Sequence, residues 1–404
     1  MAQAEPAAAR VTLPILDEAF KANPYPYYDA LRRSWGPVVP IRLPSGVEAW
    51  LVVGHDWARA LLADSRLCKQ PPRLGGQATP PAYAPAHRLF EHLLMLDAPR
   101  HTQLRAVLAR CFTPRRVAAL GPHIEEIAAC LIERIASCSG GDLIADLAMP
   151  LPYQVVCTLL GVPAHERPQL QAWLEALTMA DFDEPARTVA IAQDFDDYFC
   201  ALAQRKRAGD DDDLYADLVR ACARGECAED ALPALGFLLL AAGHETTANL
   251  IGNGMHALLA NDAWPRACAD PASATRTIEE LLRLDGALET ATARYAGEAI
   301  DIAGVTIRAG ETVFIGLAAA NRDPARFERA DQFDGTRAQA SAHLAFGRGI
   351  HSCIGAGLAR LEALVVFVAL ARQLPGLRLA QAPAALRWKP GLITRGLQAL
   401  PVRC

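Results

Sequence analysis

The sequence has no Cys-x-x-Cys pair, no flavin or iron–sulfur motif and no long apolar run. Its 404 residues include 11 cysteines without regular spacing. The cysteine count is odd, and Met1 to Arg10 lacks the basic and apolar regions of a secretory signal. These features predict reduced thiols in a cytoplasm rather than a disulfide framework.

Positive charge does not exceed negative charge. Lys and Arg number 40 against 45 Asp and Glu, which gives a net charge of -5. A nucleic-acid partner is therefore not expected. The longest apolar runs, 232–242 and 363–371, fall well short of the ~20 residues that a membrane span needs. We expect a soluble chain with a large core, because 52% of its residues are hydrophobic.

One Gly-rich stretch carries the strongest chemical signal. From Phe346 to Gly355 the sequence reads Phe-Gly-Arg-Gly-Ile-His-Ser-Cys-Ile-Gly, and it places Cys353 before an apolar helical pattern. Unpaired N–H groups at a helix N-terminus favour a thiolate. A rigidly held thiolate with no second cysteine nearby suits a single bond to haem iron. The alternatives are a buried structural cysteine, or zinc bound by His343, His351 and Cys353 without a standard spacing.

Two pairs of residues place complementary polar groups on helix faces. His101 and Arg105 are four residues apart, so they share a face and can grip a carboxylate. Glu280 and Arg283 are three residues apart on a helix predicted for 273–284. Taken alone, each pair is more commonly a solvated surface feature.

A long apolar helix is predicted for 228–260, and its centre reads Ala-Ala-Gly-His-Glu-Thr-Thr from Ala241. Gly beside Thr weakens the helical hydrogen-bond ladder, and a Thr hydroxyl can bond to the preceding turn. A bulge there would make room for a small ligand. Glu245 beside Thr246 then offers a route for protons into an apolar site. The alternative is a Gly-kinked core helix.

These motifs, in this order, resemble those of the cytochrome P450 family, and the resemblance runs from about Pro24 to Val402. It implies that Cys353 ligates the iron of haem b. It implies that Thr246 hydrogen-bonds the oxygen being activated and that Glu245 helps to deliver protons. Glu280, Arg283 and Arg337 are implied to lock the core near the haem loop. Other residues implied to contact haem are His101, Arg105, Arg294, His351, Phe346, Gly347, Gly355, Ala242 and Gly243.

The family fold is mainly α with a small β-rich region. The resemblance implies a single domain over 1–404, with haem between the 228–260 helix and a helix that begins near Ile354. Residues 1–22 are expected to be loosely ordered. The runs 38–43 and 47–53 predict a β-hairpin.

The implied function is that of a monooxygenase, which inserts one oxygen atom from O2 into a small organic substrate. Polyketides, terpenoids and peptides are the substrate classes that the resemblance implies. Electrons from NAD(P)H must arrive through separate redox partners, because the chain has no flavin or iron–sulfur motif. A peroxide-driven oxidase of the same fold and a haem sensor or carrier remain alternatives.

Several arginines predict a basic patch for an acidic ferredoxin, although ordinary surface arginines are an equally simple interpretation. They are Arg100, Arg105, Arg110, Arg115, Arg116, Arg348 and Arg360. We expect a monomer.

The segment after the 273–284 helix departs from the Pro-rich bend of many family members, so substrate identity does not carry over. Glu289 is a candidate for a polar or cationic substrate group, although a solvated carboxylate is the simpler interpretation. The candidate substrate residues are Leu239, Leu288, Glu289, Thr290 and Ile393.

Overall fold

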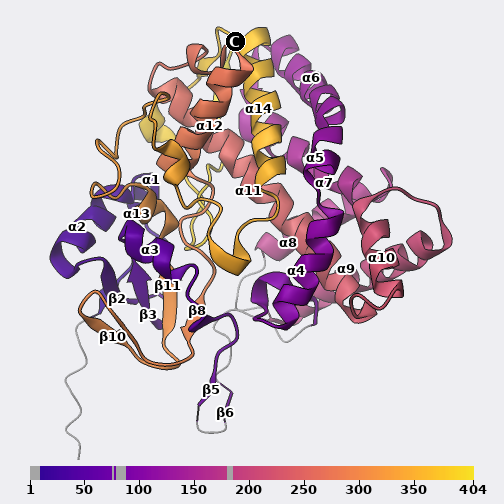
Figure 1. The fold of residues 1–404 in the computed structure, drawn as a ribbon. Helices are drawn as coiled ribbons and strands as arrows, with labels where there is room; N and C mark the ends of the chain where they lie inside the picture. Colours follow the sequence, from indigo (N-terminus) through magenta and orange to yellow (C-terminus); the bar gives the residue numbers. More distant parts are fainter. Residues whose placement is uncertain (1–9, 75–76, 79–87, 180–184) are drawn as a thin grey trace, which may run out of the picture. The chain divides into compact units, whose positions relative to one another are not determined.

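The computed structural model describes residues 10–74, 77–78, 88–179 and 185–404 (Figure 1). Its contacts divide the chain into two compact units. The first unit holds the described residues of 1–82, 252–353 and 375–403, and the second holds those of 83–251, 354–374 and residue 404. The single domain over 1–404 stays a prediction.

A six-stranded mixed sheet forms the core of the first unit. Its strand order is β1 (Val11–Thr12), β2 (Val38–Arg42), β3 (Glu48–Val52), β11 (Thr312–Ile315), β8 (Arg294–Ala296) and β4 (Leu67–Cys68). Successive side chains point to opposite faces of a sheet. Accordingly, Val38 and Val313 join one apolar cluster, whereas Val39 and Phe314 join another. Apolar residues on both faces of β2, β3 and β11 are therefore buried.

The predicted hairpin is present as β2 and β3. Val38 pairs with Val52 and Arg42 with Glu48 in an antiparallel register. The turn needs a glycine at position 46, because Gly46 has a φ of 85° and its N–H bonds to the Leu43 carbonyl at 2.8 Å.

Short helices and strands complete the first unit. The helices are α1 (Glu18–Ala22), α2 (Tyr25–Trp35), α3 (His55–Leu61), α12 (Pro271–Asp285) and α13 (Leu317–Asn321). The remaining strands are β5 (Arg73–Leu74), β6 (Gln77–Ala78), β9 (Ile300–Ile302), β10 (Val305–Ile307), β12 (Arg378–Leu379) and β13 (Pro401–Arg403). Helix α12 begins where Asp270 accepts hydrogen bonds from the N–H groups of Ala272 and Ser273.

The expectation that residues 1–22 are loosely ordered is wrong for 10–22, while 1–9 lie outside the described residues. Strand β1 pairs in parallel with β2, and the Asp17 carboxylate accepts from the Phe20 N–H at the start of α1. Leu13 is 0% exposed and Lys21 only 2%. Burial of these residues offsets the chain entropy lost when 10–22 become ordered. The Ala-rich composition before residue 10 gave no sign of this order.

The second unit is almost wholly helical. Its helices are α4 (Arg100–Cys111), α5 (Pro114–Ala119), α6 (Gly121–Ser137), α7 (Pro150–Leu159), α8 (Arg167–Met179), α9 (Pro185–Ala208), α10 (Leu214–Ala223), α14 (Ala356–Gln373) and the first part of α11 (Leu232–Ala260). A short strand, β7 (Gly140–Asp142), also belongs to it. The acidic run 210–213 ends in a cap, because Asp213 accepts from the Ala216 N–H at 2.9 Å.

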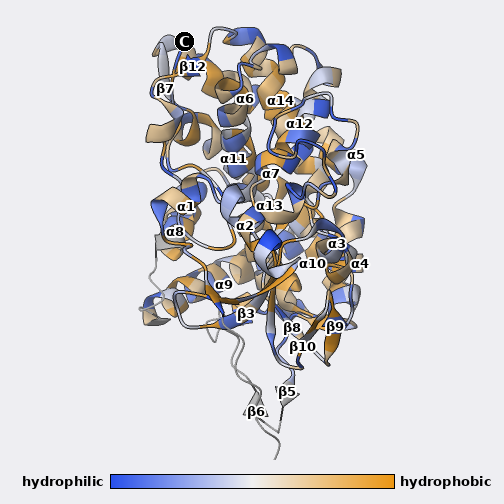
Figure 2. Cartoon of the chain, turned by 90° about the vertical axis from the view of Figure 1, so that its left-hand side faces the viewer, coloured by the Kyte–Doolittle hydropathy of each residue, from blue (hydrophilic) through white to orange (hydrophobic). Residues whose placement is uncertain are grey.

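The second unit contains one closely packed pair of helices, and α14 and the first part of α11 are rich in apolar residues. Helices α6 and α14 lie side by side (Figure 1). Helices α11 and α14 are rich in apolar residues, which Figure 2 colours orange. Among the described residues, no helix combines the length and the apolar character that crossing a membrane requires.

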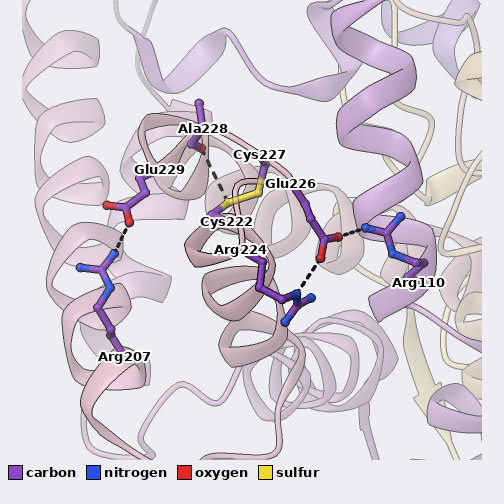
Figure 3. The surroundings of a disulfide bond; sticks show 8 residues. All are labelled: Arg110, Arg207, Cys222, Arg224, Glu226, Cys227, Ala228 and Glu229. Carbon is purple, nitrogen blue, oxygen red and sulfur yellow. Dashed lines mark hydrogen bonds and ion pairs between the residues drawn. A yellow bond between two sulfur atoms is a disulfide. The ribbon is translucent and has the colours of Figure 1, made fainter.

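A disulfide joins Cys222 at the end of α10 to Cys227 (Figure 3). Within this loop Glu226 contacts both Arg224 and Arg110 of α4. The prediction of reduced thiols is therefore wrong for these two cysteines. Their separation of five residues matches no zinc or redox motif, so only the turn after α10 shows that they meet.

Candidate functional site

Backbone geometry shapes the loop around Cys353 in the first unit. The Cys353 N–H donates to the Phe346 carbonyl at 2.9 Å, which closes the loop. Gly347 and Gly349 have φ values of 66° and 76°, a region that favours glycine. A Cβ at position 349 would lie 2.8 Å from the Leu62 carbonyl oxygen. The two glycines are therefore needed to bring the loop against the segment after α3.

The loop leaves its cysteine accessible. Cys353 is exposed and forms no disulfide, so it is not a buried structural thiol. The helix expected near Ile354 begins at Ala356, with Gly355 as its N-cap. The thiol thus precedes the helical N–H groups by three residues, close to the predicted position.

The contact predicted among Glu280, Arg283 and Arg337 is present. Arg283 donates to both oxygens of the Glu280 carboxylate at 2.8 Å, and Arg337 Nε lies 3.1 Å from each. The side chains of Glu280 and Arg283 are 0% exposed. The spacing of three residues in α12 creates the pair, and the segment before residue 337 folds back to complete it.

Hydrogen bonds connect this triad to the Cys353 loop through Asn321, which the sequence analysis missed. Arg283 donates to the Asn321 carbonyl at 3.0 Å, and the Asn321 side chain accepts from the Leu344 N–H at 2.7 Å. The Leu344 carbonyl in turn accepts from the Gly347 N–H. An isolated Asn gives no sequence signal for such a role, because its partners lie on separate segments.

The zinc alternative loses support at His343. Its Nδ1 accepts from the Ala345 N–H at 3.1 Å, and its Nε2 lies 3.2 Å from a carboxylate oxygen of Glu279. Both ring nitrogens are therefore in use. Within the described part of the chain, no group of three or more His, Cys, Asp or Glu side chains is placed to hold a metal ion.

The motif in α11 has one packed face and one accessible face in the second unit. A Cβ at Gly243 would lie 3.2 Å from Val156 Cγ2 of α7, and the His244 ring is 5.2 Å from that of Tyr153. Ala242 on the other face is exposed, and Thr246 is half-buried. His244 is thus a packing residue, and a small residue at 243 lets α7 and α11 approach.

Thr246 makes the predicted bond to the preceding turn. Its hydroxyl donates to the Ala242 carbonyl at 2.7 Å. The bulge is not formed, however, because α11 is one uninterrupted α-helix from Leu232 to Ala260.

His101, Arg105 and Arg294 lie on regular elements. His101 and Arg105 share a face of α4 in the second unit, and Arg294 begins β8 in the first. His101 is 1% and Arg294 4% exposed. Burial lowers the pKa of His101, and the charge of Arg105 lowers it further. Each of these deeply buried, nitrogen-bearing side chains has the chemistry to bind an anionic ligand group.

Glu289 and Thr290 do not fit their predicted roles at a substrate. Glu289 is 0% exposed, and its carboxylate oxygens accept from Lys21 and Tyr28. Thr290 is also 0% exposed, and its hydroxyl donates to the Leu392 carbonyl at 3.0 Å. Both polar groups are used inside the first unit. Leu288 and Ile393 are half-buried, and Leu239 of the second unit is 8% exposed.

Some arginines of the predicted basic patch form ion pairs with carboxylates of the same unit. Arg110 pairs with Glu226, and Arg116 contacts Asp217 and donates to the Cys111 carbonyl. Arg115 in the second unit and Arg348 in the first are exposed. The sequence did not reveal these ion pairs, because the acidic partners lie about 100 residues away from the arginines.

These residues fit a haem by their chemistry. An accessible cysteine would supply a thiolate ligand to haem iron, and buried cationic or N–H-bearing side chains would hold propionates.

Comparisons with known proteins point the same way. Residues 274–374 match the family model described as Cytochrome P450. The chain is 42% identical over 400 residues to cytochrome P450 monooxygenase PikC of Streptomyces venezuelae, covering 96% of this chain and 94% of that protein. It is 37% identical to mycinamicin IV hydroxylase/epoxidase of Micromonospora griseorubida, with 91% and 92% covered. The solved structure of PksS, the cytochrome P450 of the bacillaene polyketide synthase of Bacillus subtilis 168, matches with a TM-score of 0.90 at 33% identity, covering 97% of this chain and 99% of that one.

Proposed function

The chain belongs to the cytochrome P450 family and is a monooxygenase, and on that premise we propose that it oxidises a polyketide-type secondary metabolite. The proposal is supported by PksS, the cytochrome P450 of a bacillaene polyketide synthase, which is 33% identical over nearly the full chain. The accessible apolar face of α11 around Ala242 is compatible with a substrate of low polarity.

Family membership implies haem, O2 and reducing equivalents. When bound, the haem supplies a thiolate-ligated iron at which O2 is reduced and one oxygen atom is transferred to the substrate. We propose that Cys353 supplies the thiolate, with Phe346, Gly347, His351 and Gly355 shaping its loop. The buried His101 and Arg294, together with Arg105, are proposed to hold the propionates.

Proton delivery is assigned to Thr246 and Glu245. Because the Thr246 hydroxyl donates its hydrogen to the Ala242 carbonyl, its oxygen is oriented to accept a hydrogen bond from the accessible side of α11. The neighbouring Glu245 carboxyl is half-buried and supplies an exchangeable proton. Ala242, one helical turn before Thr246, is exposed and carries no large side chain on this side of the helix.

Substrate contacts are proposed for Leu239, Leu288 and Ile393. All three are apolar, and Leu288 and Ile393 keep partial exposure in the first unit. Glu289 and Thr290 are not included, because their polar groups are engaged elsewhere.

The electron donor is proposed to be an acidic ferredoxin with its reductase. The exposed Arg115 and Arg348 support this choice, whereas the paired Arg110 and Arg116 add little. We also propose a cytoplasmic monomer.

The test is turnover of a macrolactone with NADPH, ferredoxin and ferredoxin reductase, compared with hydrogen peroxide alone. Oxygenated product that depends on NADPH is the expected result. Product formed equally well from peroxide alone would favour the peroxide-driven alternative. Thiolate-ligated haem without any product would favour a sensor or carrier.

A further inference from the structure

Two segments of the first unit are joined by backbone hydrogen bonds. The Glu289 N–H donates to the Ile393 carbonyl at 2.8 Å, and the Arg395 N–H donates to the Ala287 carbonyl at 2.9 Å. Leu288 and Thr394 form an isolated antiparallel bridge between them. We refer to residues 287–290 and 391–395 as the paired segments. They carry Leu288 and Ile393, two of the proposed substrate contacts.

Lys21 of α1 bonds to both paired segments at once. Its ammonium group donates to the Glu289 carboxylate and to the Gly391 carbonyl, the latter at 2.9 Å. Its backbone carbonyl accepts from the Arg395 guanidinium at 2.7 Å. One residue therefore contacts the start and the end of 391–395 as well as the middle of 287–290.

A second set of buried polar groups supports the same contacts. Tyr28 of α2 donates its hydroxyl to Glu289, and Arg395 donates to Asp285 at the end of α12 at 2.5 Å. Tyr25 donates to the same Asp285 oxygen at 2.6 Å. Burial acts to raise the pKa of Asp285, but the Arg395 and Arg322 charges hold it below its ordinary value. The carboxylate is therefore ionised and paired.

Burial makes these contacts specific. Lys21 is 2%, Glu289 0% and Arg395 1% exposed. Water competes poorly for such groups, so each charge is tied to the geometry that satisfies it. Moving either paired segment would leave a buried charge without a partner. Exposed pairs such as Arg42–Glu48, whose side chains are 54% and 48% exposed, impose no comparable restraint.

We propose that Lys21, Tyr28 and Glu289 are positioning residues for the substrate, because they fix the paired segments that carry Leu288 and Ile393. The inference rests on the proposed function, since it assumes that these two apolar side chains contact the substrate. It assigns a role to α1, a helix of five residues near the N-terminus, which touches no substrate itself.

Binding of two azole probes distinguishes a change in the shape of the pocket from a change at the haem iron. Imidazole and 4-phenylimidazole ligate haem iron through the same nitrogen, but only the phenyl ring reaches the surrounding apolar side chains. Lys21→Met is compared with Arg42→Met, which removes a positive charge from the same unit at an exposed site. The ratio of the two dissociation constants is measured by optical titration. Hydrogen exchange at the Glu289 and Arg395 amides is followed separately and needs no ligand.

For Lys21→Met we expect the Kd of 4-phenylimidazole to rise about tenfold while that of imidazole stays within about twofold. The Glu289 and Arg395 amides should exchange faster. Arg42→Met should match the wild type in both measurements. If Lys21→Met does not fold, Tyr28→Phe, which removes one hydroxyl, should show the same changes to a smaller degree.

An unchanged ratio or unchanged amide exchange in a folded variant would overturn the positioning role and leave the proposed function standing. Wild-type protein without a thiolate–haem spectrum would instead remove the proposed function and this inference with it.

Discussion

Replacing Glu280 by Gln tests the link between the buried triad and the Cys353 loop. The substitution keeps the shape of the side chain but removes the charge that Arg283 and Arg337 share. Both side chains would remain largely buried, at 0% and 10% exposure. Breaking a buried ion pair on one side costs about 3–5 kcal/mol. That is a large part of the roughly 5–15 kcal/mol by which a native protein is stable.

Urea denaturation followed by fluorescence measures the loss, and the reduced carbon monoxide spectrum reports on the cysteine loop. We expect both to change, because hydrogen bonds run from Arg283 through Asn321 to Leu344, which precedes the loop. Glu328→Gln is the matched control, since the Glu328 side chain is 90% exposed. A Glu280→Gln protein that unfolds within about 1 kcal/mol of the wild type and keeps its spectrum would refute the reasoning.

Three other substitutions test the remaining parts of the account. Thr246→Ala should keep haem but divert reducing equivalents to peroxide, measured as peroxide formed per NADPH consumed. Thr275→Ala is the control, because it loses a similar bond to its preceding turn and should remain coupled. Tight coupling in Thr246→Ala would contradict the assignment. Gly349→Ala should cost about 1–3 kcal/mol and weaken haem retention, because its Cβ would meet the Leu62 carbonyl, whereas Gly357→Ala, with nothing within 4 Å, should not. Burial raises the pKa of Glu362 well above its ordinary value, so the folded state keeps this proton while the unfolded state releases it, and stability falls as pH rises above about 4.5. Glu362→Gln should therefore flatten the pH dependence of the unfolding free energy and raise stability at neutral pH; an unchanged profile would show that this carboxyl does not titrate as described.

The sequence was most informative where function depends on local spacing. Glu280 and Arg283 are one helical turn apart, so their pairing follows from α-helix geometry once the helix is recognised. The bond from Thr246 to Ala242 has the same local origin. The glycines of the Cys353 loop could likewise be read as backbone requirements.

Contacts between distant segments were not accessible in this way. Lys21 and Glu289 are 268 residues apart, and neither has a neighbour in sequence that signals the pair. The interpretation of Glu289 as a substrate contact or solvated carboxylate failed for that reason. The disulfide between Cys222 and Cys227 was missed although it is local, because its spacing belongs to no known motif.

The central claim is that the Cys353 thiolate ligates the haem iron. The most direct test is the reduced carbon monoxide spectrum of Cys353→Ser beside that of Cys138→Ser, which removes another exposed cysteine that forms no disulfide. The wild type and Cys138→Ser should show the strongly red-shifted Soret band of thiolate-ligated haem, and Cys353→Ser should lose it. Retention of that band in Cys353→Ser would contradict the account.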